Sequence, residues 1–285
     1  MISKEQFEQE IQIIIKNAIR EDVGEGDHSS LACIPATAQG RAKLLVKDQG
    51  IIAGVGFAEK VFGTMDPTLK LELLKTDGEV VTHGDIVFYV NGAVQSILKA
   101  ERLVLNSMQR MSAIATKTRH YADLLKGTSA KILDTRKTTP GIRALEKWAV
   151  RIGGGENHRF ALYDMVMLKD NHIDFAGGIG KAIGKTKKYL EKIGKPLQII
   201  VEARNLNEVR EILEAGGADR ILLDNFNLED TRKAVRLIGG RCQTESSGGI
   251  DESSLRDYAE CGVDFISSGA LTHSVHNMDL SLKAV

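Results

Sequence analysis

The chain lacks several features that would place it in a special class of protein. None of its apolar runs approaches the ~20 residues of a membrane-spanning helix. Its first residues do not follow the basic and then apolar pattern of a secretory signal peptide. Its three cysteines, Cys33, Cys242 and Cys261, are odd in number and far apart, so they predict neither a disulfide framework nor a zinc site. These absences lead us to expect a protein of the reducing cytoplasm.

The chain also has no excess of either charge. Lys and Arg together number 38, and Asp and Glu together also number 38. A protein without net charge has no long-range field to draw it to nucleic acid or to a membrane surface, so we expect neither as a partner. A preference for an anionic ligand would have to come from a local group of cations. With 285 residues, 42% of them hydrophobic, the chain can bury one large core or two modest ones.

The segment up to residue 92 predicts a small α+β domain. Residues 5–19 carry apolar side chains at helical spacing, which indicates an amphipathic helix. Residues 38–92 instead contain short β-like apolar runs separated by Asp-Gly, His-Gly and Asn-Gly turns. Residues 96–125 contain neither Gly nor Pro and keep apolar positions at helical spacing. They predict a long helix, or a helix pair, that leads into the rest of the chain.

From Lys131 onward, short apolar runs alternate with helix-like segments. Each run is followed at once by a charged or small polar residue: Asp134, Lys169, Glu202, Asp224 and Ser267. The interval from Glu202 to Asp224 is 22 positions, and the interval from Asp224 to Ser246 is again 22. Repeated strand–helix units predict a parallel sheet, and functional groups at successive strand ends favour an α/β barrel over an open sheet. Too few units are visible for eight, so an incomplete barrel is predicted.

Two Ser-Gly segments follow the last two predicted strands. They are residues 246–249 (Ser-Ser-Gly-Gly) and residues 267–269 (Ser-Ser-Gly). Hydroxyl groups, close backbone N–H groups and a helix N-terminus can together bind a phosphate. One such segment alone is more often an ordinary loop, whereas two at consecutive strand ends favour a phosphate site. Glu202 and Asp224, on neighbouring strand ends, can hold a hard cation, but a salt-bridged strand terminus explains them equally well.

Nine cationic or imidazole side chains gather between residues 136 and 172. They are Arg136, Lys137, Arg143, Lys147, Arg151, His158, Arg159, Lys169 and His172. A run of charge is usually a solvated face, and the helical spacing of Arg143, Lys147 and Arg151 fits that explanation. The others follow predicted strands or a Gly-rich loop. A neutral protein that concentrates cations on its predicted catalytic face indicates an anionic, multiply charged substrate.

Five blocks of sequence resemble the quinolinate phosphoribosyltransferase family, in the order in which that family has them. They are residues 134–141 (Asp-Thr-Arg-Lys-Thr-Thr-Pro-Gly), 153–159, 168–172, 245–250 and 269–274. The resemblance implies an N-terminal α/β sandwich domain over residues 1–108 and an incomplete, seven-stranded type of α/β barrel over residues 109–270. The tail, from about residue 271 to 285, is expected to pack back on the first domain.

The resemblance also implies an activity and a set of site residues. The family converts quinolinate and phosphoribosyl pyrophosphate to nicotinate mononucleotide, pyrophosphate and CO2 in NAD biosynthesis, using Mg²⁺. Quinolinate binding is implied for Arg102, Thr135, Arg136, Lys137, His158, Arg159 and Lys169. Phosphoribosyl pyrophosphate binding is implied for Lys137, Glu202, Asp224, Ser246, Ser247, Gly248, Ser267, Ser268 and Gly269. The implied catalytic groups are Lys137, Lys169, Glu202 and Asp224, of which the two carboxylates hold Mg²⁺, directly or through water.

Arg102 matches an arginine that the family inserts into the site of the neighbouring subunit, which implies a homodimer. Assembly of such dimers into a hexamer stays open. Two positions depart from the pattern of the family: Ala113 stands where Gly is expected, and Ser246 where many members have Ala or Val. Neither departure removes a charged group.

Three alternatives remain. A paralogue on the same scaffold that acts on nicotinate or another aromatic acid would need fewer cations around the ring of its substrate. An unrelated phosphate-binding barrel lyase or isomerase would share the sheet and the phosphate loops. Residues 78–92 faintly resemble a lipoyl-type carrier module, but they offer no convincing lysine at the hairpin tip.

Overall fold

The computed structural model describes residues 2–285, which divide into two compact units. The N-terminal unit contains residues 3–119, 138–154 and 271–285. The barrel unit contains residues 120–137 and 155–270, together with the first residues of the chain. Within residues 2–285, no helix combines the length and the apolarity that a membrane span requires.

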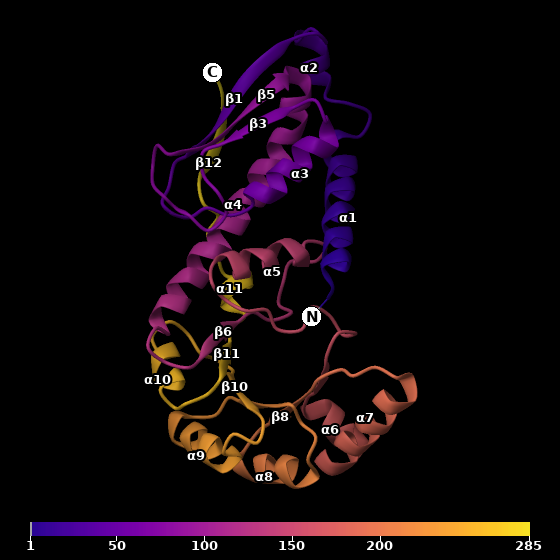
Figure 1. Ribbon diagram of the computed structural model, residues 1–285, viewed down its shortest axis with the longest axis vertical. Coiled ribbons are helices and arrows are strands. Elements are labelled where there is room, and N and C mark those ends of the chain that lie inside the picture. Colours follow the sequence, from indigo (N-terminus) through magenta and orange to yellow (C-terminus); the bar gives the residue numbers. More distant parts are fainter. Residues whose placement is uncertain (1) are drawn as a thin grey trace. The chain divides into compact units, whose positions relative to one another are not determined.

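The N-terminal unit is built on an antiparallel four-stranded sheet in the order β12-β1-β5-β3 (Figure 1). Its strands are β1 (Gln39–Val46), β3 (Lys70–Leu73), β5 (Ile86–Ala93) and β12 (Leu280–Ala284), and a separate pair joins β2 (Gly50–Ile51) to β4 (Val80–Val81). Strand β12, from the end of the chain, pairs along β1 from Ala42 to Val46. The sheet therefore needs residues 280–284 for its completion.

The helices of the N-terminal unit are α1 (Lys4–Val23), α2 (His28–Cys33), α3 (Val55–Met65), α4 (Val94–Leu124) and α5 (Arg143–Ile152). A capping box between Ser3 and Gln6 begins α1, because each side chain accepts from the other's backbone N–H. The core lies between α3 and the sheet, where the rings of Phe62 and Phe88 meet edge to face at 6.0 Å. The segment 96–125 forms one continuous helix, α4, and not a pair.

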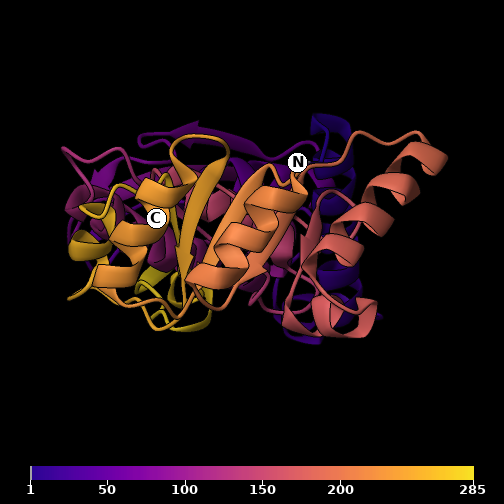
Figure 2. The same ribbon diagram turned by 90° about the horizontal axis from the view of Figure 1, so that it is seen from below.

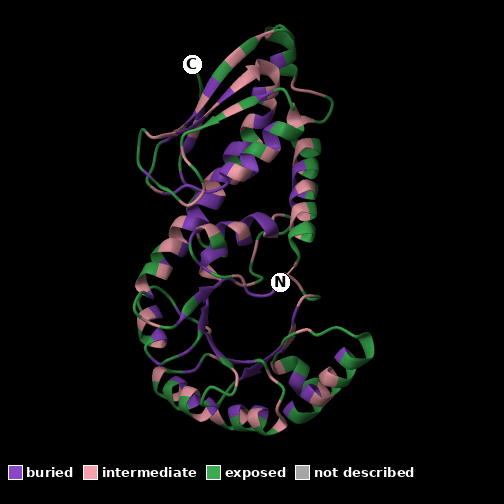
Figure 3. Cartoon of the chain, viewed as in Figure 1, coloured by how far each residue is buried: buried purple, intermediate pink, exposed green. Residues whose placement is uncertain are grey.

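The barrel unit contains six parallel strands in the order β6-β11-β10-β9-β8-β7. They are β6 (Lys131–Leu133), β7 (Val166–Leu168), β8 (Ile199–Ala203), β9 (Arg220–Asp224), β10 (Gln243–Ser247) and β11 (Phe265–Ser267). The seventh position of the expected barrel is held by a single bridge, in which Glu156 lies parallel to Leu133 beside β6. The strands form a largely buried arc in Figure 3. No strand pairing joins β7 to the other end of this arc within residues 2–285, so the barrel is incomplete.

Helices cover the outside of this arc. They are α6 (Asp170–Ala176), α7 (Ile179–Ile193), α8 (Leu206–Ala215), α9 (Leu228–Ile238) and α10 (Leu255–Ala259). A short helix, α11 (Ala270–His273), follows β11, and its residues from Leu271 onward belong to the N-terminal unit. Figure 2 shows α7, α8 and α9 side by side, each packed on the next. Asn205 and Asn227 cap α8 and α9 by accepting backbone N–H groups of the first turn. Since α8 follows β8 and α9 follows β9 within a few residues, both helices start at the same edge of the sheet.

Candidate active site

The C-terminal ends of the parallel strands bring the predicted site residues of the barrel unit to one edge of the sheet. Lys169 directly follows β7, whose last residue pairs with Val201, the neighbour of Glu202 on β8. Asp224, at the end of β9, pairs with Ser247 on β10. Side chains from successive strands thus meet at this edge, as expected for the catalytic face of an α/β barrel.

The other half of the edge is formed by β11 and β6. Ser267, the last residue of β11, pairs with Leu133, the last residue of β6. The backbone N–H of Ser268 donates to the carbonyl of Leu133 at 3.0 Å, which places Ser268 beside Asp134. The two predicted Ser-Gly phosphate segments consequently leave neighbouring strands, β10 and β11, at the same edge.

The register of the strands also sorts their side chains into layers. Leu222 and Glu245 are paired, and Leu222 belongs to an apolar cluster inside the arc together with Met165 and Ile200. Alternate residues of a strand share a face, so Asp224 and Ser247 point to the same interior one layer nearer to the edge. The layer of Leu222 thus combines apolar side chains with the charged Glu202 and Glu245, and the layer at the edge is polar.

Ser246 faces the opposite side of the sheet from Ser247. It is 1% exposed, and its hydroxyl has no hydrogen-bond partner within residues 2–285. A serine turned away from the interior can reach a ligand there only with its backbone. This orientation explains why Ala or Val is expected at the position.

Glu202 is the more deeply placed of the two predicted metal carboxylates. It is 7% exposed, and its Oε2 lies 3.6 Å from the Nζ of Lys169. Burial raises the pKa of Glu202, the charge of Lys169 lowers it, and the charges of Asp224 and Asp170 raise it again, so the net change is upward. Negative charge is therefore crowded at this point, and a cation placed between Glu202 and Asp224 would relieve the repulsion.

Asn225 links Asp224 to the Ser-Gly loop after β10. Its Nδ2 donates to Asp224 Oδ2 at 2.8 Å, and its backbone N–H donates to the carbonyl of Ser247 at 2.9 Å. Asn225 has a φ of 55°, and Gly248 has a φ of 97°. A Cβ on Gly248 would lie 2.2 Å from Oδ1 of Asn225. Only glycine fits this close approach, so the loop and the carboxylate are held as one assembly.

The segment 157–159 is fixed by Asp134. This carboxylate is fully buried and accepts from the backbone N–H of His158 at 2.8 Å and from Nδ2 of Asn157 at 2.6 Å. Arg159 is only 6% exposed. Burial lowers the pKa of Arg159, the nearby charge of Arg136 lowers it further, and Asp164 opposes both. Two guanidinium groups held near each other, one of them buried, favour binding of an anion.

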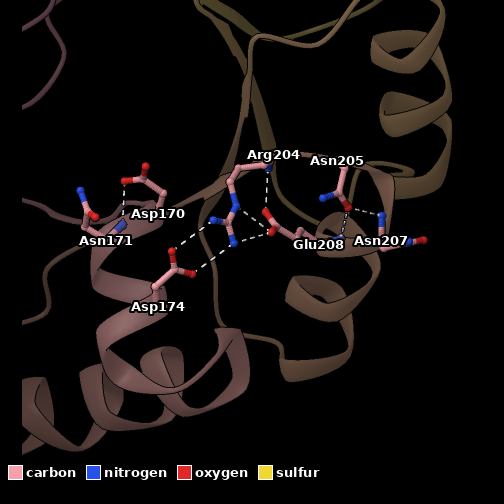
Figure 4. A network of polar contacts seen from close by, with 7 residues as sticks. All are labelled: Asp170, Asn171, Asp174, Arg204, Asn205, Asn207 and Glu208. Atoms are coloured by element: carbon pink, nitrogen blue, oxygen red, sulfur yellow. Dashed lines mark hydrogen bonds and ion pairs between the residues drawn. The ribbon is translucent and has the colours of Figure 1, made fainter.

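Arg204, directly after β8, ties helix α6 to helix α8. Its guanidinium contacts both oxygens of Asp174 on α6 at 3.2 Å and Glu208 on α8 at 2.8 Å (Figure 4). Both contacts raise the pKa of Arg204, with Glu208 the larger cause. Lys169 is the N-cap of α6, so this bridge helps to hold Lys169 beside Glu202.

Comparison with known proteins covers both units. The model of the quinolinate phosphoribosyl transferase C-terminal domain matches residues 114–283, and the model of its N-terminal domain matches residues 27–112. The chain belongs to the quinolinate phosphoribosyl transferase family.

Relatives of this family match the chain over nearly its whole length. A chloroplastic nicotinate-nucleotide pyrophosphorylase (carboxylating) of Arabidopsis thaliana is 45% identical over 289 residues, covering 96% of this chain and 82% of the relative. A mitochondrial quinolinate phosphoribosyltransferase (decarboxylating) of Nicotiana tabacum matches to the same extent. The solved nicotinate-nucleotide pyrophosphorylase of Francisella tularensis is 37% identical, with a TM-score of 0.89 over 97% of this chain and 96% of that one.

The pair Glu202 and Asp224 fits the Mg²⁺ that the quinolinate phosphoribosyl transferase family implies. Residues 2–285 contain no group of three or more His, Cys, Asp and Glu side chains able to hold a metal by themselves. Mg²⁺ commonly takes only one or two carboxylates and completes its shell with water and substrate phosphates. Two crowded carboxylates next to two phosphate loops supply that kind of donor set.

The barrel unit does not contain every cation singled out from the sequence. Arg102, on α4, and Arg143, Lys147 and Arg151, on α5, belong to the N-terminal unit. The barrel unit contains Thr135, Arg136, Lys137, His158, Arg159 and Lys169 together with Glu202, Asp224 and the two Ser-Gly segments. Sequence reasoning missed the contributions of Asp134, Arg220, Asn225 and the side chain of Glu245. The sequence offered one signal for such contributions: a charged residue inside a strand predicted to be buried, such as Glu245, needs a buried polar partner.

Proposed function

We propose that this protein transfers the phosphoribosyl group of phosphoribosyl pyrophosphate to quinolinate and removes one carboxylate, giving nicotinate mononucleotide, pyrophosphate and CO2 for NAD biosynthesis. The observation that carries the proposal is a group of cations beside a crowded pair of carboxylates at one edge of a parallel sheet. The names of the plant relatives, one of them a decarboxylating quinolinate phosphoribosyltransferase, support this choice of substrate.

The cationic half of the edge suits quinolinate. Its two adjacent carboxylates can be met by Arg136 and Arg159, which lie close enough for their charges to interact. Arginine can bind a carboxylate through two parallel N–H donors, and such pairs strengthen in a partly buried site. Thr135, Lys137, His158 and Lys169 are assigned to the same half.

The carboxylate half suits the sugar and its phosphates. Glu202 and Asp224 would hold Mg²⁺, directly or through water, and the ion would neutralise the departing pyrophosphate. The interior hydroxyls of Ser247 and Ser267, with Ser268 and the backbone N–H groups of Gly248 and Gly269, are assigned to the phosphates. Ser246 contributes its backbone, since its side chain faces away.

The reaction asks for position and charge more than for acid–base groups. The pyridine nitrogen attacks the anomeric carbon while pyrophosphate leaves, and positive charge develops on the sugar. Glu202 and Asp224 stabilise that charge. Loss of CO2 then leaves an electron pair on the ring carbon next to the alkylated nitrogen, and the positive charge of that nitrogen stabilises the pair until a proton is added. Lys137 and Lys169 are the two candidates for the proton that replaces the lost carboxylate.

We further propose that the active form is a homodimer in which each subunit gives Arg102 to the other's site. Arg102 has a side chain 60% exposed within its own chain, and its contact there is to the adjacent Glu101 at 3.4 Å. Such an arginine is available to a second copy. Assembly of dimers into a hexamer stays open, and the reducing cytoplasm remains our expectation for the compartment, in keeping with three free cysteines.

Release of CO2 from quinolinate tests the activity. We expect release only when both phosphoribosyl pyrophosphate and Mg²⁺ are present. Nicotinate should be a poorer substrate by at least about a hundredfold in kcat/KM, because it lacks the second carboxylate for a group of cations that includes the buried Arg159. Comparable efficiency on nicotinate would favour the paralogous enzyme, whereas trapping of a carbonyl substrate by borohydride would favour a barrel lyase.

A further inference from the structure

A buried ion pair lies inside the barrel unit, one layer below its polar edge. Nη1 of Arg220 on β9 donates to Oε2 of Glu245 on β10 at 2.8 Å. Arg220 is 8% exposed and Glu245 is fully buried, and the guanidinium lies 4.0 Å from the ring centroid of Phe265. A buried ion pair adds little to stability by itself, because the cost of removing both charges from water offsets their attraction. We therefore expect the main effect of this ion pair to be the orientation of a neighbouring side chain.

That group is the imidazole of His158. Its Nε2 lies 3.4 Å from the same Oε2 of Glu245. Its Nδ1 accepts the backbone N–H of Arg159 at 2.7 Å. A ring nitrogen that accepts a hydrogen bond carries no hydrogen, so the hydrogen of the ring is on Nε2, where it faces the carboxylate.

We propose that Glu245 and Arg220 are positioning residues that act through His158 to hold Arg159 in place for quinolinate. Arg220 fixes the carboxylate of Glu245, the carboxylate keeps the ring hydrogen on Nε2, and the free lone pair on Nδ1 holds the backbone of Arg159. Both ring nitrogens thereby face protein groups. His158 serves the substrate through Arg159, and not by gripping quinolinate with its own nitrogens.

The surroundings of the segment support this arrangement. Asp134 holds the backbone N–H of His158 from one side, while Glu245 meets its ring from the other. Burial alone would raise the pKa of Glu245, but hydrogen bonding to His158 and the charge of Arg220 outweigh burial and lower it. Glu245 is therefore an anion over the working range of pH and keeps its negative charge 3.4 Å from Nε2.

The tautomer of His158 can be measured on the unaltered protein without substrate. Two-bond ¹⁵N–¹H correlation spectra separate protonated from unprotonated ring nitrogens, and loss of one spin system in His158→Asn identifies the residue. We expect hydrogen on Nε2 and a lone pair on Nδ1. Hydrogen on Nδ1 would overturn the proposal. The inference about quinolinate rests on the proposed function, whereas this measurement needs no substrate. Failure of the positioning role can therefore be told apart from failure of the proposed function.

Two substitutions of His158 separate its nitrogens in the kinetics. In His158→Asn, the side-chain oxygen can replace Nδ1 as acceptor for the N–H of Arg159. In His158→Gln, the amide instead reaches the position of Nε2. We expect KM for quinolinate to rise less in the Asn variant, by about two- to tenfold relative to Gln, which corresponds to one hydrogen bond. Equal values or the reverse order would contradict a positioning role.

Glu245→Gln tests the other end of the chain of contacts. The new amide can donate to Nε2, which would move the ring hydrogen to Nδ1 and break the contact with Arg159. We expect KM for quinolinate to rise while KM for phosphoribosyl pyrophosphate stays nearly constant. The control is Asp264→Asn. The Asp264 carboxylate accepts from the backbone N–H of Thr244, the neighbour of Glu245 on β10, at 2.7 Å, and so also binds this strand. An equal rise in both KM values, or an equal effect of the control, would mean that Glu245 only stabilises the strand.

Discussion

Lys169 and Glu202 face each other across the ends of β7 and β8, with Nζ 3.6 Å from Oε2. We propose Lys169 for quinolinate and Glu202 for the sugar and metal, and on that proposal this ion pair lies where the two halves of the site meet. Lys169 is the N-cap of α6, and Arg204 joins α6 to α8. Arg204 therefore helps to hold Lys169 beside Glu202.

Replacement of Glu202 by Gln should separate stability from activity. The folded-state pKa of Glu202 is raised, so the ionised carboxylate costs stability above its ordinary pKa of 4.5. We expect Glu202→Gln to raise Tm of the substrate-free protein at pH 7, and the gain to vanish as pH falls below that value. At the same time kcat/KM for phosphoribosyl pyrophosphate should fall by about a hundredfold or more. Calorimetry should find quinolinate binding nearly unchanged, and its large loss in a folded variant would contradict the assignment.

Gly248→Ala should damage the phosphate loop through both strain and collision. The backbone φ of 97° is unfavourable for alanine, and the new Cβ would lie 2.2 Å from Asn225. We expect a loss of about 1–3 kcal/mol in phosphoribosyl pyrophosphate binding. Gly249→Ala is the matched control, since its φ is 62° but nothing lies within 4 Å of its added Cβ. Calorimetric titration of both variants checks the prediction, and equal losses would exclude the collision as the cause.

The barrel and the placement of several candidate residues at strand ends could be predicted because they depend on local patterns. Short apolar runs ending in Glu202 or Asp224 predict strand ends, and β8 and β9 end at or next to these residues. The regular spacing of 22 positions did not predict in which layer of the barrel interior each side chain lies. Asp224 pairs with Ser247, one residue beyond Ser246, and Glu202 pairs with Leu222, one layer deeper than Asp224. A shift of one residue reverses the face of a side chain, so only the register reveals that Ser246 points away.

Contacts between distant segments could not be predicted. Asp134 meets His158 because residue 156 returns beside β6 through a single bridge, for which the sequence has no local signal. The link from Arg220 to His158 needs three segments whose alignment is set by sheet pairing. Such contacts arise from packing of the whole unit. A sequence motif can identify one residue of a contact but not its partner.

The contribution of Glu245 to stability should be lost in acid. Its folded-state pKa is lowered from 4.5, so the contribution is present above that value and is lost as pH falls through the folded-state pKa. We expect Tm of the wild type to exceed that of Glu245→Gln at pH 7, because the Gln variant leaves Arg220 buried without its partner. The difference should shrink steadily below pH 4.5. A difference that does not vary with pH, followed by calorimetric scans, would contradict the ionised pair.

Arg102 should act in the site of the other subunit. Arg102→Ala and Lys137→Ala proteins, each inactive alone, should recover part of the activity when refolded together, because some hybrid dimers then contain one intact site. The control is refolding each variant with itself, which should restore nothing. Mixed dimers can be demonstrated by tagging one variant. Absence of recovery in proven hybrids would refute the exchange of Arg102.

Arg159→Lys should show that geometry, and not charge alone, selects quinolinate. Lysine keeps the positive charge but loses the planar pair of donors that matches a carboxylate. It also loses the N–H groups that reach the carbonyl of Met165, at 3.4 Å, from inside the buried segment. The expected cost is about 1.5–3 kcal/mol, the worth of one hydrogen bond to a charged group, or a ten- to hundredfold rise in Kd for quinolinate.

The matched control for this substitution is Arg210→Lys. Arg210 is an exposed arginine of α8 whose guanidinium contacts Asn207 at 2.7 Å, so its replacement should leave the affinity for quinolinate unaltered. Isothermal titration of both variants with quinolinate and with nicotinate gives four dissociation constants. In Arg159→Lys the affinity for quinolinate should fall more than that for nicotinate, because the second carboxylate loses its bidentate partner. An equal fall for both acids would mean that Arg159 contacts only the carboxylate that they share.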